Sequence, residues 1–167
     1  VLTEHQTAGK GRGTNVWWAS PGALTFSLVL DVAGRESGAE SWPRFALAAA
    51  VAICESLEAA APGVLFGIRW PNDVCCDRRK ICGVLPELHL GASPRLVLGI
   101  GINANNSMEG APGDLKESAT SILELTNRRT NLTNLLIDVL RRLDARLHDL
   151  AVSSPDLPRA WSERCLL

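Results

Sequence analysis

The sequence predicts an α+β fold in which a largely antiparallel sheet is flanked by helices. Three β-like runs, at 64–70, 80–90 and 94–103, follow one another with only short polar turns between them. Short links favour antiparallel neighbours, because a parallel pair needs a crossover of a dozen or more residues. Two longer segments, 43–61 and 132–150, repeat apolar residues at helical spacing. We therefore expect one sheet with long helices packed against it.

The first half of the chain contains one predicted strand and one predicted helix. The segment "ALTFSLVL" at 23–30 is rich in β-formers and follows the turn sequence "SPG", which indicates a core strand. The helix over 43–61 starts with Pro43, a residue suited to a first turn, and ends before "PG" at 62–63. Its apolar stripe consists of Leu47, Ala50, Val51, Cys54 and Leu57. This pattern is typical of an amphipathic helix of about five turns.

The second half contains another long helix, over 132–150, with Asn131 as the expected N-cap. Its stripe consists of Leu132, Leu136, Val139, Leu143, Leu147 and Leu150. The segment "LPRAWSERC" at 157–165 predicts a last short helix. No internal repeat, low-complexity tract or linker divides the sequence, so residues 1–167 are expected to form one domain.

Composition excludes several classes of function. Lys and Arg number 17 and Asp and Glu number 18, so the net charge of -1 provides no basic field for DNA or an anionic membrane. The longest apolar run, at 45–54, is too short to span a bilayer. The five cysteines contain no CxxC pair, and no signal-peptide core opens the chain. Reduced thiols in the cytoplasm are the expectation.

A glycine-rich basic segment, "AGKGRG" at 8–13, is the first candidate for chemistry. It is not a Walker A loop, because Gly11 rather than Ser or Thr follows Lys10, and not a Rossmann fingerprint, because a strand follows it. Two interpretations remain open: a solvated turn, or a backbone that wraps closely round an anion. In the second, Lys10 supplies a point charge and Arg12 a planar fork for phosphate oxygens.

The second candidate joins "RWPNDV" at 69–74 to "RRKICG" at 78–83. The letters "PND" are typical of a turn, and a hairpin between the flanking strands would bring Asp73 and Lys80 to neighbouring positions. The two charges could form a surface ion pair worth under about 1 kcal/mol. They could equally form a catalytic pair, and these residues alone leave both interpretations open.

The third candidate is "LGIGIN" at 98–103, where Gly99 and Gly101 interrupt an otherwise strong strand. Two glycines on one face weaken a strand, because they add backbone freedom and provide no side chain to pack. The pattern indicates either a bulge or the close approach of a ligand.

All three candidates occur in this order in one known family. The segments "QTAGKGRG" to "WWASP", "RWPNDV" with "RKICGVLPE", "VLGIGIN" and "SATSI" resemble the catalytic domain of biotin protein ligase, also called holocarboxylase synthetase. The resemblance covers about residues 1–165. It implies a mixed, largely antiparallel sheet flanked by helices, similar to class II aminoacyl-tRNA synthetases. It also implies an AMP-forming ligase: the carboxylate of biotin attacks the α-phosphate of ATP, and biotinyl-5′-adenylate then acylates a lysine of a biotin carboxyl carrier protein.

The resemblance further implies roles for individual residues. The expected catalytic residues are Arg12, Lys80 and Asp73, of which Asp73 would either help place Mg²⁺ or orient the incoming lysine. The expected biotin contacts are Gln6, Gly9, Lys10, Gly11, Arg12, Lys80, Gly83, Gly99 and Gly101. The expected ATP contacts are Lys10, Arg12, Gly13, Trp17, Asn72, Lys80 and Asn103, with Trp17 stacked on adenine. Preorganised cations suit this chemistry, because it brings anions together.

The implied partner is the carrier domain of a biotin-dependent carboxylase, and a homodimer is a candidate assembly. Two other functions stay open. One is a lipoate- or octanoate-protein ligase-like transferase of the same fold, although its loops differ from "GKGRG". The other is a truncated paralogue that binds adenylates or carrier proteins without turnover.

The chain also departs from the family pattern. Lys10 stands where many members have Arg, and Arg69 where many have Lys, which keeps the charge but not the geometry. Pro86 removes a ladder donor from its strand and predicts an edge or a bulge there. Two parts of the family's domain are expected to be absent: a first strand and helix with a Ser-Thr-Asn motif that contacts biotin, and a small C-terminal β-barrel.

Overall fold

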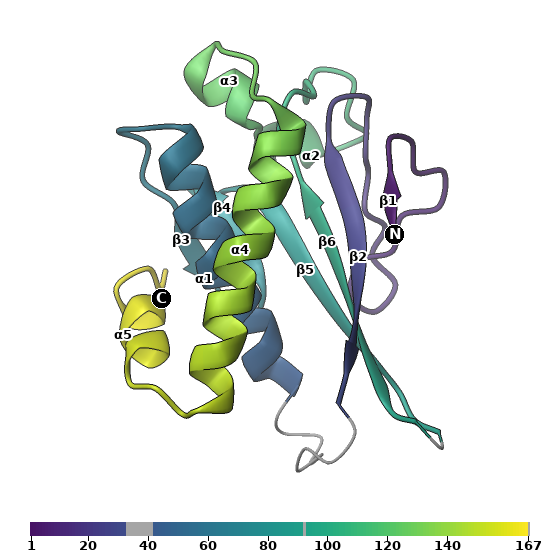
Figure 1. Ribbon diagram of the computed structural model, residues 1–167. Coiled ribbons are helices and arrows are strands. Elements are labelled where there is room, and N and C mark those ends of the chain that lie inside the picture. The colour runs from purple at the N-terminus through teal and green to yellow at the C-terminus, as the bar shows by residue number, and fades with distance from the viewer. Residues whose placement is uncertain (33–41, 92, 167) are drawn as a thin grey trace.

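The structure is a computed structural model that describes residues 1–32, 42–91 and 93–166. Within these residues the strands form one six-stranded sheet in the order β1-β2-β6-β5-β4-β3 (Figure 1). Their bounds are Leu2–Thr3 for β1, Leu24–Asp31 for β2, Gly67–Arg69 for β3, Asp73–Cys76 for β4, Arg79–His89 for β5 and Arg95–Ile102 for β6. All paired strands are antiparallel, as the short links predicted.

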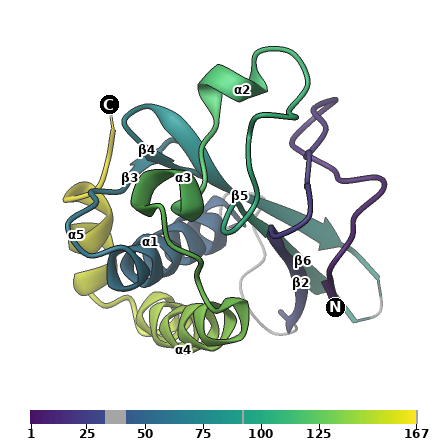
Figure 2. The same ribbon diagram turned by 90° about the horizontal axis from the view of Figure 1, so that it is seen from above.

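Two long helices, α1 (Trp42–Ala60) and α4 (Leu132–Ala151), cover one face of the sheet, and the N-terminal segment lies on the other (Figure 2). Helix α5 (Asp156–Ser162) packs beside α1, and the short helices α2 (Leu115–Ser118) and α3 (Ile122–Thr126) precede α4. The two predicted long helices and the predicted final helix are therefore confirmed. Asn131 caps α4 as expected, because its side chain accepts a hydrogen bond from the Asn134 amide at 3.0 Å.

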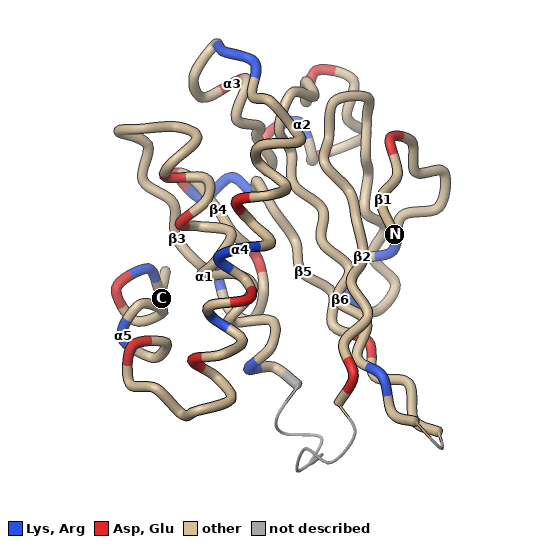
Figure 3. The backbone as a smooth tube through the Cα atoms, in the orientation of Figure 1, with Lys and Arg blue, Asp and Glu red and all other residues tan. Residues whose placement is uncertain are grey.

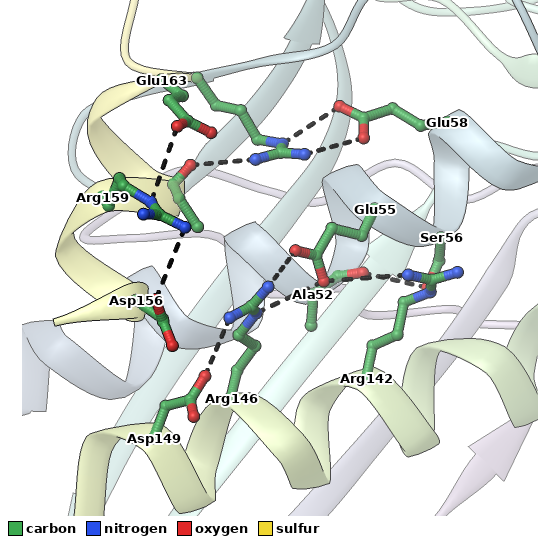
Figure 4. Close-up of polar contacts among 12 residues, drawn as sticks. Ala52, Glu55, Ser56, Glu58, Arg142, Arg146, Asp149, Asp156, Arg159 and Glu163 are labelled. Carbon is green, nitrogen blue, oxygen red and sulfur yellow. Dashed lines mark hydrogen bonds and ion pairs between the residues drawn. The ribbon is translucent and has the colours of Figure 1, made fainter. Parts of the chain in front are cut away.

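Ion pairs join the helices to one another (Figure 4). Glu55 on α1 pairs with Arg146 of α4, and Glu58 pairs with Arg164 at 2.9 Å. Acidic and basic residues are interspersed along α4 and α5 (Figure 3). No helix in the described part of the chain is long and apolar enough to cross a membrane.

The prediction of a single hairpin between the strands at 64–70 and 80–90 is wrong. Residues Asp73–Cys76 form a separate strand, β4, so the chain makes two successive hairpins. The second has its turn at Asp77 and Arg78, whose φ values of 46° and 66° belong to the left-handed region. A two-residue hairpin turn of type I′ requires positive φ at both of its central residues. Such turns are favoured between antiparallel strands because their backbone twist matches that of the strands. The sequence pattern did not reveal this turn, since it contains neither Asn nor Gly.

A β-bulge between β4 and β5 determines which way Lys80 points. Val74 pairs with Cys82, but Cys75 pairs with Lys80, so Ile81 is an extra residue on β5. Ile81 and Cys82 are both completely buried in the core on the helix side. Strict alternation would place Lys80 on that side too, whereas the bulge turns it to the open face of the sheet.

Pro86 lies where β5 has lost one neighbour. The pairing of β4 with β5 ends at Gly83, while β6 continues alongside β5. The Val84 amide points to the β4 side, where it donates to the Asn72 carbonyl at 3.2 Å. Pro86, two residues on, directs its nitrogen the same way, so its missing N–H breaks no pairing with β6. The edge predicted at this position is confirmed.

Candidate active site

A cavity of about 800 Å³ opens on the face of the sheet opposite α1 and α4. Its walls come from the glycine-rich loop, the turn before β4, and residues of β2, β5 and β6. Most of the predicted site residues line it: Gln6, Lys10, Gly11, Arg12, Trp17, Asn72, Asp73, Lys80, Gly83, Gly99, Gly101 and Asn103. The three sequence clusters therefore converge on one cavity.

Gly9 and Gly13, which were expected to contact biotin and ATP, do not line the cavity. Gly9 is buried in the base of the loop, where its carbonyl accepts a hydrogen bond from the Trp17 amide at 3.0 Å. A methyl group on Gly9 would lie 2.2 Å from the Trp17 carbonyl oxygen, so only glycine fits there. Gly13 has φ +65° and open space around it. Both glycines shape the loop.

The indole of Trp17 covers part of the cavity floor. A methyl group on Gly101 would lie 2.4 Å from Trp17 Cε2, and one on Gly83 would lie 3.4 Å from Cζ3. Gly101 therefore accommodates Trp17, whereas the nearest neighbours of a methyl group on Gly83 would be Lys80 Cε and Nζ, at 3.1 and 3.2 Å. The expected contacts of these two glycines with biotin stay predictions. A methyl group on Gly99 would make only ordinary contacts, the nearest at 3.6 Å to the Leu85 carbonyl oxygen. The buried Trp17 Nε1 has no hydrogen-bond partner among the described residues.

Asp73 and Lys80 form an ion pair at the cavity wall. Lys80 Nζ lies 2.6 Å from Asp73 Oδ1, and Arg69 Nη2 lies 3.1 Å from Asp73 Oδ2. The ammonium also lies 5.6 Å from the centre of the Trp17 ring, within range of a cation–π contact. The predicted proximity of Asp73 and Lys80 is thus confirmed, although β4 rather than a turn provides it.

The two asparagines hold the walls in place through the backbone. The Asn72 side-chain amide donates to the Val84 carbonyl, which ties the turn to β5. Asn103 is buried, its backbone amide donates to the Ile81 carbonyl at 2.8 Å, and its Oδ1 accepts from Asn106 Nδ2 at 3.1 Å. Neither geometry tests a contact with ATP, so those two roles stay predictions.

Several lining residues were missed by the sequence interpretation: Ala8, Trp18, Thr25, Ser27, Leu85, Glu87, Val97, Met108 and Leu115. Alternation along the predicted strands could have found some of them, because Thr25 and Ser27, like Leu85 and Glu87, occupy every second position of one face. Trp18, next to Trp17 in the sequence, borders the cavity as well.

The environment of the cavity suits anions better than a resident metal ion. Lys10, Arg12 and Lys80 all border it, although the whole chain has a net charge of -1. Within the described ranges, no group of three or more His, Cys, Asp and Glu side chains could hold a metal ion.

Beneath the floor, burial raises the pKa of the Cys82 thiol well above its ordinary value, despite the nearby Lys80 charge. Cys82 is therefore a packing residue.

Comparisons with known proteins agree with one another. The Biotin/lipoate A/B protein ligase family matches the chain over residues 1–103. The biotin--[acetyl-CoA-carboxylase] ligase of Mycobacterium tuberculosis is 32% identical, over 99% of this chain and 60% of its own length. The bifunctional ligase/repressor BirA of Bacillus spizizenii is also 32% identical, over 89% of this chain and 46% of its own length. The chain therefore spans about half of each relative.

The fold has a counterpart among solved structures. A biotin protein ligase from Aquifex aeolicus, solved in complex with biotin and ATP, superimposes with a TM-score of 0.86 at 29% identity. The alignment covers 99% of this chain and 67% of that one. The predicted fold class, a largely antiparallel sheet flanked by helices, is thereby confirmed.

Proposed function

Because the chain belongs to the biotin/lipoate A/B protein ligase family, we propose that it activates biotin with ATP and transfers it to a protein lysine. In the first step the biotin carboxylate attacks the α-phosphorus of ATP, forming the acyl-phosphate bond of biotinyl-5′-adenylate as pyrophosphate leaves. In the second step the amine of the lysine attacks the acyl carbon. An amide bond forms, AMP leaves, and the amine loses a proton.

One observation carries this proposal: cations from separate sequence clusters border a single cavity. Lys10 and Arg12 come from the loop and Lys80 from β5, and all three line it. Joining a carboxylate to a triphosphate concentrates negative charge, and groups that are already in place stabilise such charge without reorganisation. The relatives named as biotin ligases and the structure solved with biotin and ATP support the same substrates.

For Asp73 we propose the second of its two predicted roles, to orient the incoming lysine. Mg²⁺ commonly binds one or two carboxylates together with substrate phosphates, and it would offset phosphate charge when it enters with ATP. Both oxygens of Asp73 already contact cations, however. Asp73 does not fit a magnesium ligand in this arrangement, and no step here depends on the metal. Asp73 can instead accept a hydrogen bond from the approaching amine, since a carboxylate oxygen has more than one lone pair and one oxygen is released when Lys80 moves onto the phosphates.

The proposed acceptor is a lysine in a biotin carboxyl carrier domain of a carboxylase, in keeping with the name of the Mycobacterium tuberculosis relative. The cytoplasmic location, the homodimer and the absence of DNA binding stay predictions. Lipoate or octanoate is the second candidate substrate, because the family that matches residues 1–103 is described by both biotin and lipoate.

Exchange of labelled pyrophosphate into ATP tests the proposal. We expect exchange that depends on biotin and is not supported by lipoate or octanoate at the same concentration. Exchange that follows lipoate or octanoate would transfer the proposal to the second substrate class. Absence of exchange with every acid, in a protein shown to be folded by circular dichroism, would support the non-catalytic paralogue.

A further inference from the structure

Arg69, Asp73 and Lys80 form a row of three charges beside the cavity. Arg69 and Asp73 face each other across β3 and β4, and Asp73 faces Gly83 of β5 in turn. One oxygen of the Asp73 carboxylate contacts Arg69 at 3.1 Å and the other contacts Lys80 at 2.6 Å. Arg69 does not line the cavity and has no role in the reaction described above.

The row affects the charge that Lys80 presents to a substrate. Lys80 and Asp73 alone would form a neutral pair, and a carboxylate so close opposes the approach of an anion to the ammonium. The Asp73 side chain is only 19% exposed, so water screens it less than it screens Arg69, which is 49% exposed. With Arg69 included, the three groups together carry one positive charge. Arg69 therefore offsets the effect of Asp73.

We propose that Arg69 is a positioning residue that holds the Asp73 carboxylate and so leaves Lys80 able to move onto the anionic reaction centre. The proposal rests on the adenylation reaction proposed above. When the substrates bind, Lys80 Nζ exchanges the Asp73 oxygen for a phosphate oxygen. Arg69 stays on the other oxygen of Asp73, so the carboxylate is not left without a cation at the cavity wall.

The geometry indicates that charge, rather than shape, is what Arg69 contributes. A single guanidinium nitrogen, Nη2, contacts a single carboxylate oxygen, and the contact is not a bidentate fork. A lysine can supply one such donor and the same charge, whereas methionine supplies neither. Arg69→Lys should therefore behave as the native protein does, and Arg69→Met should not.

The chain offers a matched control in another cross-strand pair. Arg95 faces Asp31 across β6 and β2, with Arg95 Nη1 3.1 Å from Asp31 Oδ1. Neither residue lines the cavity. Arg95→Met therefore removes the same kind of contact at the same distance without altering the charges beside Lys80.

The first test is biotin-dependent exchange of pyrophosphate into ATP. We expect Arg69→Met to slow exchange about fivefold, near the upper value for a partly exposed ion pair, while Arg69→Lys and Arg95→Met change it less than about twofold. In an Asp73→Asn background, Arg69→Met should have no further effect, because the carboxylate through which it acts is gone. An equal loss in both backgrounds would overturn the proposal.

The second test does not require activity. The sequence has three lysines, Lys10, Lys80 and Lys116, so acetylation by acetic anhydride can be followed at each by mass spectrometry. In Arg69→Met the Asp73 carboxylate should hold Lys80 more tightly, and Lys80 should react about two- to fivefold more slowly relative to Lys10 and Lys116. In Asp73→Asn it should react faster than in the native protein.

The two tests separate the two proposals. If the native protein shows no exchange, the proposed function fails, but the acetylation rates still decide whether Arg69 controls Lys80. If Lys80 reacts at the same rate in Arg69→Met as in Arg95→Met, the role of Arg69 is overturned whatever the activity. Circular dichroism and a thermal melt of each variant establish that the compared proteins are folded.

Discussion

The indole of Trp17 rests directly on the backbone of Gly101. The position of a Cβ on Gly101 lies 2.4 Å from Trp17 Cε2 and 2.6 Å from Nε1, far closer than nonbonded carbon atoms approach. Two segments about eighty residues apart thus meet because one lacks a side chain. The contact places Trp17 beside Lys80, where the ring and the ammonium interact.

Gly101→Ala is expected to push Trp17 off the sheet. The added methyl cannot share the space with the indole, so the variant should lose about 1–3 kcal/mol of unfolding free energy in urea, as overpacked sites do. The Trp17 fluorescence, taken as the difference from Trp17→Phe, should shift to longer wavelength as the ring becomes wet. Gly99→Ala is the control on the same strand, because its nearest neighbour would lie at 3.6 Å. Equal effects of the two substitutions would contradict the observed packing.

Lys80→Met is expected to slow adenylate formation about 10²-fold while it weakens biotin binding much less. The ammonium contact strengthens as charge develops on the α-phosphate, so its loss acts mainly on the transition state. Single-turnover formation of the adenylate gives the rate, and calorimetry with biotin alone gives the affinity. Lys116→Met removes a lysine that does not line the cavity and should change neither quantity. Equal losses in rate and affinity would remove Lys80 from this role.

If the proposed reaction holds, Arg12→Gly is expected to release the adenylate early rather than to prevent its formation. Arg12 lies in the exposed loop at the cavity and forms no ion pair within the described residues, so its guanidinium is available to an adenylate. Without it the adenylate should still form at Lys80 but escape, and then label lysines of unrelated proteins. Serum albumin incubated with enzyme, biotin and ATP should show more streptavidin signal with Arg12→Gly than with the native protein. Continued pyrophosphate release without this rise would show that Arg12 does not retain the intermediate.

Stability is expected to fall above about pH 9, because burial raises the pKa of the Cys54, Cys75, Cys76 and Cys82 thiols. In the unfolded chain these thiols lose their protons near pH 8.5, whereas in the folded protein they keep them. The unfolded state then binds fewer protons, so each thiol lowers the unfolding free energy by about 1.4 kcal/mol per pH unit until the folded pKa is reached. Urea unfolding between pH 7 and 10 measures this slope. Cys82→Ala should make it shallower, and an unchanged slope would contradict the assignment.

Most elements of the fold could be predicted because their signals are local. The apolar stripe of α4 repeats along one helix, and β2 and β6 are each a continuous run of residues that favour strands. Strand β4 could not be predicted in this way. It is four residues long, and its hairpin turn places Arg78, a residue type that seldom adopts a left-handed backbone, where glycine is usual.

The sequence by itself determined which residues could serve an anionic substrate: the loop with Lys10 and Arg12, the Asp73 and Lys80 cluster, and the paired glycines. Only the tertiary structure decided how they face one another. The bulge at Ile81 turns Lys80 away from the core and toward Asp73, and Trp17 occupies the space that Gly101 leaves. Both outcomes depend on the register of paired strands and on contacts between distant segments. Local propensity contains no information about either, because a shift of one residue sends a side chain to the opposite face of the sheet.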